Sequence, residues 1–156
     1  MSQSVFIAKH IREFYFGGNW TAVNLRDGLA GLSWKEAIHK IDELHSIAEL
    51  VYHINYFARV VTRVLEGEPL KGKDSESFDC PSIQNSSDWE ELKNRTWKEA
   101  EKFISLVENL PEEELPNLLA DEKYGSYQRN LFGIIEHSHY HLGQIILIRK
   151  LLKKGN

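Results

Sequence analysis

Cysteine is nearly absent from this chain of 156 residues, since Cys80 is the only one. A single cysteine excludes a disulfide within the chain and a zinc site built from several thiolates. No stretch approaches 18 uninterrupted apolar residues, which excludes a membrane-spanning helix. The first residues reach Lys9, His10 and Arg12 before they form the apolar centre of a signal peptide. We therefore expect a cytoplasmic protein.

An excess of positive charge is also missing. Nineteen Lys and Arg residues stand against 23 Asp and Glu residues, giving a formal net charge of −4. Such a chain lacks the basic footprint of a nucleic-acid-binding protein and the basic patch of a membrane-surface protein, so we expect neither partner. Its length and its 42% of hydrophobic residues predict a single packed domain over residues 1–156.

The sequence shows no internal repeat and no run of strand-type alternation, whereas helical signals recur. Apolar spacing, glycines and prolines predict a first helix over 4–16, a second piece over 20–29, and long helices over 46–65, 88–109 and 127–153. Gly17 and Gly18 break the first helix, and residues 66–86 form a long loop of a kind that often covers a functional site. The expected fold is all-α, a four-helix bundle with a broken first helix and a long loop between the second and third long helices.

Helix starts are marked by the pattern Ser-x-x-Glu, in which the serine accepts a hydrogen bond from the glutamate amide and the glutamate accepts one from the serine amide. This pattern occurs at residues 33–36, 46–49 and 87–90. The last two precede segments with long helical periodicity, so both are expected to begin long helices.

Three of the seven histidines are expected to face the core. His137 and His141 lie about 40° apart around a helix, on a stripe shared with isoleucines. His53 projects among Phe57 and other apolar residues of the 46–65 helix. His139 points to the other side of the last helix. One core histidine alone would indicate an ordinary hydrogen-bonded residue, but burying three imidazoles without partners is costly.

A divalent cation would remove that cost by accepting one nitrogen from each ring. His137 and His141 have the spacing with which two imidazoles of one helix reach the same ion, and His53 is the best-oriented third ligand. Three neutral nitrogens leave a position open, as in a catalytic site rather than a closed structural one. Zinc fits these ligands, and nickel, copper and iron also accept imidazole.

Two segments resemble the DinB-like superfamily, also called YfiT-like. They are SIAELVYHINYF at residues 46–57 and IIEHSHYHLGQI at residues 134–145, matching a histidine in the second bundle helix and an H-x-x-x-H-x-G-Q stretch in the last. The resemblance implies a four-helix bundle, often a homodimer, with a metal site at His53, His137 and His141. Relatives include S-transferases and an isomerase that use low-molecular-weight thiols, and proteins described as metal-dependent hydrolases.

Three functional hypotheses follow. The leading one is a metal-dependent enzyme in which zinc or nickel activates a thiol or water, for S-transferase or hydrolase chemistry on a small molecule, with a low-molecular-weight thiol as a further cofactor. The alternative is a non-catalytic metal- or small-ligand-binding protein of a stress response. The third is a helical dimer whose histidines make ordinary core hydrogen bonds and hold no metal.

Other polar residues near these histidines allow more than one role. Glu49 could orient a group or accept a proton, although capping the helix at Ser46 is favoured. Gln144 could hydrogen-bond a ligand imidazole or a substrate, or serve as a buried structural amide. Cys80 is expected to be a bystander, because no sequence-near histidine or lysine is placed to lower its pKa.

The last helix is apolar nearly all round, with Phe132, Ile135, Leu142 and Ile146 away from the histidine stripe. A helix that is hydrophobic on every side is normally buried on every side. Four helices do not cover such a surface by themselves, so we expect a homodimer through the last helix.

Overall fold

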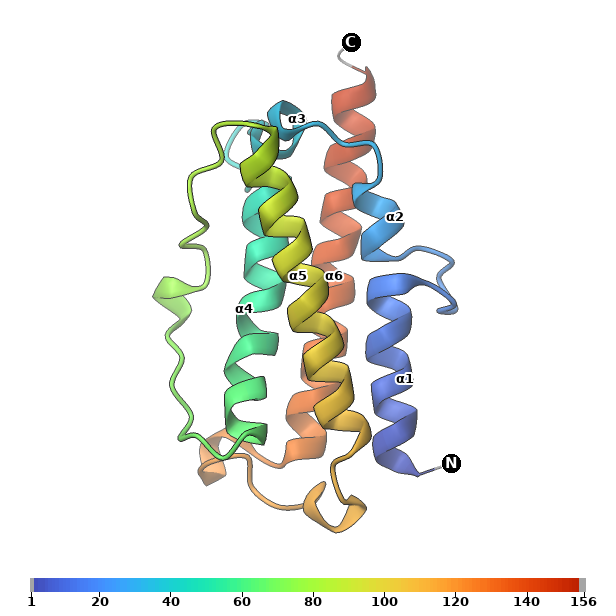
Figure 1. Cartoon of the computed structure of the whole chain (residues 1–156), viewed down its shortest axis with the longest axis vertical. Helices are drawn as coiled ribbons and strands as arrows, with labels where there is room; N and C mark the ends of the chain where they lie inside the picture. The colour runs from blue at the N-terminus through green and yellow to red at the C-terminus, as the bar shows by residue number, and fades with distance from the viewer. Residues whose placement is uncertain (1, 155–156) are drawn as a thin grey trace.

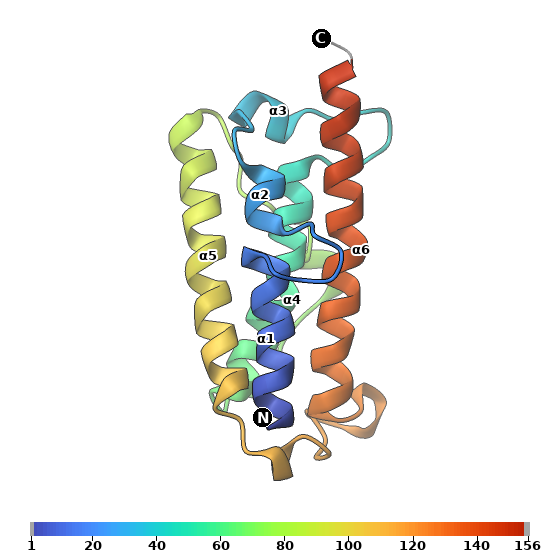
Figure 2. The same ribbon diagram turned by 90° about the vertical axis from the view of Figure 1, so that its right-hand side faces the viewer.

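The computed structural model describes residues 2–154 and contains no strand within that range (Figure 1). Its helices are α1 (Gln3–Phe16), α2 (Leu25–Leu29), α3 (Trp34–Ile38), α4 (Ile47–Leu65), α5 (Ser86–Glu108) and α6 (Tyr127–Lys154), with short 3-10 turns η1 (Asp74–Glu76), η2 (Glu112–Glu114) and η3 (Glu122–Tyr124). The four longer helices, α1, α4, α5 and α6, pack together as in a bundle, which confirms the predicted all-α fold (Figures 1 and 2). None of the described helices is long and apolar enough to cross a membrane.

The predicted helical piece over 20–29 is wrong in its first half, because α2 begins only at Leu25. The Asn19 side chain donates hydrogen bonds to the carbonyls of Glu13 and Val23, at 3.0 and 2.6 Å, which fixes a turn here. Short polar side chains compete with helix formation in this way. Trp20 is 99% exposed on that turn, so no packing favours a helix there.

Two of the three predicted capping patterns form as expected, at Ser33 and at Ser46. The third, at residues 87–90, is wrong. Helix α5 begins at Ser86, two residues earlier than predicted, because Asn85 is the cap and its side-chain oxygen accepts a hydrogen bond from the Asp88 amide at 3.0 Å. The Asp88 carboxylate in turn accepts one from the Gln84 amide at 2.8 Å, so this pair completes the cap without the serine.

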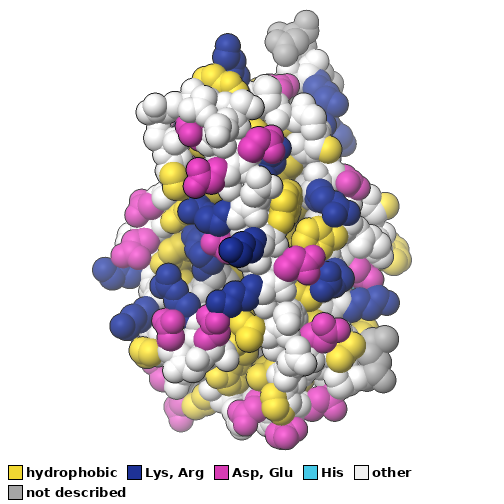
Figure 3. Space-filling view, in the orientation of Figure 1, with side chains coloured by type: hydrophobic (Ala, Val, Ile, Leu, Met, Phe, Trp, Pro, Cys, Tyr) yellow, Lys and Arg dark blue, Asp and Glu magenta, His cyan; other side chains and the backbone are white. Residues whose placement is uncertain are grey.

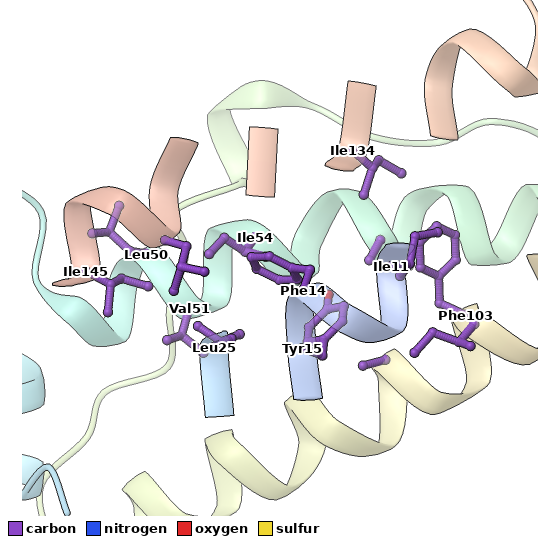
Figure 4. Packing of buried hydrophobic residues seen from close by; sticks show 14 of the residues in the cluster. Ile11, Phe14, Tyr15, Leu25, Leu50, Val51, Ile54, Phe103, Ile134 and Ile145 are labelled. Atoms are coloured by element: carbon purple, nitrogen blue, oxygen red, sulfur yellow. The ribbon is translucent and has the colours of Figure 1, made fainter. Parts of the chain in front are cut away.

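The core lies between the four long helices. Its apolar side chains come from all four of these helices. Those labelled in Figure 4 include Phe14 and Tyr15 of α1, Ile54 of α4, Phe103 of α5 and Ile145 of α6. Each of them is at most 1% exposed. The bundle is therefore held mainly by burial of apolar surface along its whole length.

Helices α4 and α5 run in the same direction, so the chain between them must return along the full length of α4 (Figure 1). We call residues 66–85 the strap. It corresponds to the long loop predicted over 66–86, shortened by one residue because α5 begins at Ser86, and it contains η1. The Lys73 amide donates a hydrogen bond to the Tyr56 hydroxyl at 2.8 Å. Gly72 packs so closely that a Cβ there would lie 3.0 Å from a methyl carbon of Val60. These contacts hold the strap against α4.

Candidate metal centre

His53 of α4 and His137 and His141 of α6 meet inside the bundle. Their ligand atoms all lie within 4.8 Å of one another. The Nε2 atom of His137 is 3.0 Å from Nε2 of His53 and 3.1 Å from Nε2 of His141. The predicted convergence of these three side chains is thus a feature of the structure.

The spacing of the nitrogens fits a metal ion. In a tetrahedral zinc site with zinc–nitrogen bonds near 2.0–2.1 Å, two ligand nitrogens lie about 3.3 Å apart. The separations from His137 Nε2 to the other two Nε2 atoms, 3.0 and 3.1 Å, are within a few tenths of an ångström of that value. All three imidazoles present Nε2 to the same place, so the residues present fit such an ion.

The electrostatics of the cluster favour neutral rings. Burial, followed by the neighbouring His141, lowers the pKa of both His53 and His137 to about 4. Burial also lowers the pKa of His141, against the opposing effect of its Gln144 hydrogen bond. At neutral pH each ring therefore has one nitrogen with a free lone pair, which is the form that binds a metal.

Hydrogen bonding within the protein does not satisfy these rings. Nδ1 of His141 lies 2.7 Å from the Gln144 side-chain oxygen and must donate to it, which leaves the Nε2 lone pair of neutral His141 directed at His137. Nε2 of His137 therefore lies between two nitrogens, Nε2 of His141 and Nε2 of His53. A single proton on His137 Nε2 cannot make a hydrogen bond in both contacts. Nδ1 of His53 is buried without any partner. This arrangement disfavours the reading in which the histidines make ordinary core hydrogen bonds.

The strap contributes to the site through Phe78, a role that the sequence analysis missed. The Phe78 ring is stacked between His45 and His53, with centroid distances of 3.9 Å on both sides. The backbone of Ser77, also in the strap, raises the pKa of His53 and so acts against the effect of burial. It does not come close enough, or at the right angle, to make a regular hydrogen bond with Nδ1. A loop has no hydrophobic periodicity from which the direction of an aromatic side chain can be predicted. The position of Phe78 beside His53 is therefore known only from the path of the strap in the structure.

Glu49 lies at the start of α4, where its carboxylate accepts a hydrogen bond from the Ser46 amide at 2.7 Å and pairs with Lys40 at 2.8 Å. Burial opposes ionisation of Glu49, but these hydrogen bonds outweigh it and lower its pKa. Glu49 is not part of the histidine cluster within the described chain. The structure thus places it in the favoured capping role.

Cys80 and His139 both lie apart from the cluster. Burial, and next the charge of Glu49, raises the pKa of the Cys80 thiol to about 11, which disfavours the reactive thiolate. The thiol points to the Ala48 carbonyl at 3.6 Å. His139 packs edge-on against Phe14 at 5.3 Å between centroids, on the other side of α6 as expected.

A cavity of about 630 Å³ adjoins the cluster. Of the three histidines only His137 lines it, and Phe57 stands beside that ring at a centroid distance of 4.9 Å. The cavity lies between α4 and α6 and is completed by the strap and by the connection from α5 to α6. On the face drawn in Figure 3 no histidine is visible among the described residues, in keeping with burial of the cluster. A small molecule could therefore reach the cluster along His137.

The fold and site define a class, a helical bundle with a three-histidine cluster between two of its long helices. The chain belongs to the DinB superfamily, whose family model matches residues 19–145. The matched range contains all three histidines of the cluster. No curated protein and no solved structure matches the chain.

Proposed function

We propose that the chain is a metal-dependent enzyme in which His53, His137 and His141 hold a divalent transition metal, zinc or nickel foremost. The observation that carries this proposal is the convergence of three neutral imidazole nitrogens at one buried point beside an open cavity. Bound metal would lower the pKa of a thiol or a water molecule and so supply a nucleophile near neutral pH.

The protein's own side chains orient the ligands. The Gln144 oxygen fixes the ring and the tautomer of His141, so that Nε2 is the nitrogen left for metal. Phe78 stacks on His53 and restricts both the rotation of that ring and the access of water to it. His53 is 7% exposed and His141 is 8% exposed.

The surroundings favour a thiol over water as the group activated. Within the described residues no carboxylate joins the three histidines, so an acidic base would have to act from the adjoining cavity, which Asp74 and Glu122 line. A thiol ionises more readily than water and depends less on such a base. The proposed reaction is therefore S-transfer from a low-molecular-weight thiol to a small molecule, with hydrolysis as the other chemistry open to this site.

The absence of a carboxylate from the histidine cluster, among the described residues, also supports the alternative, a non-catalytic protein that binds a metal or a small ligand in a stress response. The two proposals differ in turnover alone. Both predict stoichiometric metal, and only the enzyme consumes a thiol or hydrolyses a substrate once the metal is restored.

The first experiment is elemental analysis of untagged protein, with a His53→Ala/His141→Ala variant and the exposed His39→Ala variant as matched control. We expect about one metal ion per chain in the wild type and in His39→Ala, lost in the double variant. Absence of metal from wild-type protein after incubation with zinc or nickel would contradict the metal site. Thiol-transfer and hydrolysis assays with that metal then separate the enzyme from the binding protein.

We also propose a homodimer through α6, on a surface that differs from the one the sequence indicated. Leu142 is buried within the chain, and Phe132, Ile135 and Ile146 are partly buried against the core, with Ile146 beside Gly28 of α2. The apolar side chains that α6 leaves uncovered are Tyr140, Leu147 and Leu151, which are 66, 56 and 41% exposed. Light scattering after size exclusion should show a dimer that Leu147→Glu dissociates, and a wild-type monomer would refute it.

A further inference from the structure

The cavity beside His137 has two kinds of lining. Apolar and aromatic side chains of α4 and α6 form part of its walls, including Val61, Ile134 and Phe57, which stands beside His137. Charged side chains come from the strap, from the turn before α6 and from the first turns of α6. They are Asp74, Glu122, Lys123 and Arg129. This division suits a molecule with an apolar part and a charged end.

Arg129 lies along the α6 wall of the cavity between two glycines. A Cβ at Gly125 would be 3.7 Å from its Cγ, and a Cβ at Gly133 would be 3.1 Å from its Nη1 atom. The absence of side chains at these two positions leaves the room in which the arginine lies. Arg129, Gly133 and His137 follow one another at intervals of four residues on one face of α6, so the guanidinium stands one turn from His137, about 6 Å along the axis.

The guanidinium of Arg129 has hydrogen-bonding capacity left over. Its ion pair with Glu136 measures 3.6 Å, and the two side chains are 67 and 71% exposed. An exposed pair of this kind contributes little, and its donors remain available to a ligand. Lys123 has a similar exposed pair with Asp121 at 3.8 Å and lies 4.6 Å from the centroid of the Tyr124 ring, on the turn before α6. Arg129, whose Nη1 atom reaches Gly133, is therefore the cation best placed to receive an anion near His137.

We propose that this cavity binds a small carboxylic acid, with its carboxylate on Arg129 and its apolar part extending over Gly133 towards His137. The inference rests on the proposed function, since it places the reacting group of that acid beside the metal centre. Asp74 and Glu122 line the same cavity and would repel further negative charge. The substrate class is thus a singly charged carboxylate with an apolar chain, and multiply charged phosphate esters are disfavoured.

The test compares matched probes by isothermal titration calorimetry on zinc-loaded protein. The probes are 6-mercaptohexanoate and 6-mercaptohexanol, which share the thiol and the chain and differ in the charged end. We expect the acid to bind at least about tenfold more tightly, because a hydrogen-bonded charge pair is involved. Arg129→Gln should abolish this preference, and Arg129→Lys should keep part of it because the charge remains.

The matched control is Arg12→Gln, which removes one positive charge from the exposed pair with Glu101, away from the cavity. This variant should keep the preference for the acid. Equal binding of acid and alcohol to the wild type, or an unchanged preference in Arg129→Gln, would overturn the inference. Tighter binding of hexyl phosphate than of hexanoate would overturn the part that concerns single charge.

Failure of this inference can be told apart from failure of the metal proposal. If the protein takes up no zinc, the metal proposal fails. Hexanoate and hexanol titrated into that metal-free protein still show whether Arg129 selects a carboxylate. If zinc binds and both thiols bind equally, the metal proposal stands and the carboxylate site is refuted.

Discussion

Two buried polar clusters share helix α4, and they differ in how their groups are satisfied. Around Asn55, the Tyr15 hydroxyl donates to the amide oxygen at 2.9 Å, while the amide nitrogen donates to the Thr96 carbonyl and to Glu99, at 3.2 and 3.0 Å. Around His53, two residues earlier, nitrogen faces nitrogen and one ring atom has no partner. The polar groups of the first cluster are paired within the protein, whereas the second cluster leaves nitrogens unpaired and could hold a metal ion.

This contrast separates a polar cluster whose groups pair within the protein from one that could hold a metal ion. The Asn55 cluster ties α1, α4 and α5 together, and burial raises the pKa of Tyr15 so that its hydroxyl stays a donor. The histidine cluster joins α4 to α6, and its three rings could hold a metal ion. Burial of polar groups therefore has a different meaning in the two places.

The largest expected effect is stabilisation by metal. Saturating zinc at about 1,000 times its dissociation constant should raise the free energy of unfolding of the wild type by about 4 kcal/mol. His53→Ala/His141→Ala should lose this gain, while His39→Ala should retain it. Chemical denaturation with zinc and with a chelator measures the difference, and an equal response of all three proteins would remove the contrast between the two clusters.

The next-largest effect is expected in metal-free protein, where the Asn55 cluster should contribute more to the free energy of unfolding than the histidine cluster does. Asn55→Ala should lower the free energy of unfolding by about 3 kcal/mol, because Tyr15 and Glu99 lose buried partners. His53→Leu should change it by less than about 1 kcal/mol, since an apolar side chain removes an unsatisfied nitrogen. Denaturation in the presence of a chelator gives both values, and a larger loss from His53→Leu would show that the histidines are structural.

A third expectation concerns pH in metal-free protein. The folded-state pKa of His53 and of His137 is about 4, below the usual 6.5. Between these values the unfolded chain binds more protons than the folded one, so the free energy of unfolding should fall as the pH decreases through this window. His53→Leu/His137→Leu should flatten that dependence in denaturation curves, whereas an equally steep curve would show that other groups cause it.

The smallest expected effect concerns orientation of a ligand. Gln144→Leu removes the acceptor of His141 Nδ1 and should weaken zinc binding by about 10-fold to 100-fold with little loss of metal-free stability. Gln144→Glu keeps an acceptor and should bind zinc nearly as well as the wild type. Competition with a chromogenic chelator measures these affinities, and an unchanged affinity in Gln144→Leu would assign the amide to packing alone.

The sequence carried the parts of this molecule that depend on local periodicity. The 3.6-residue repeat places His137 and His141 on one face and turns His53 inward. The cap at the start of α4 depends only on Ser46 and Glu49, which are three residues apart in the sequence. The start of α5 was misplaced because Asn85 competes with Ser87 for the same role. Phe78 and Arg129 were not found, because their positions depend on the path of a loop and on glycines at a cavity wall.

The common direction of α4 and α5 has a consequence for the length of the strap. Helix α4 has 19 residues and so spans about 28 Å, which an extended chain covers with about nine residues. The strap runs from residue 66 to residue 85, roughly twice what the crossing needs. The surplus length lets the chain form η1 and turn Phe78 inward between two histidines. A shortened strap could still join the helices, yet it would leave one side of His53 bare.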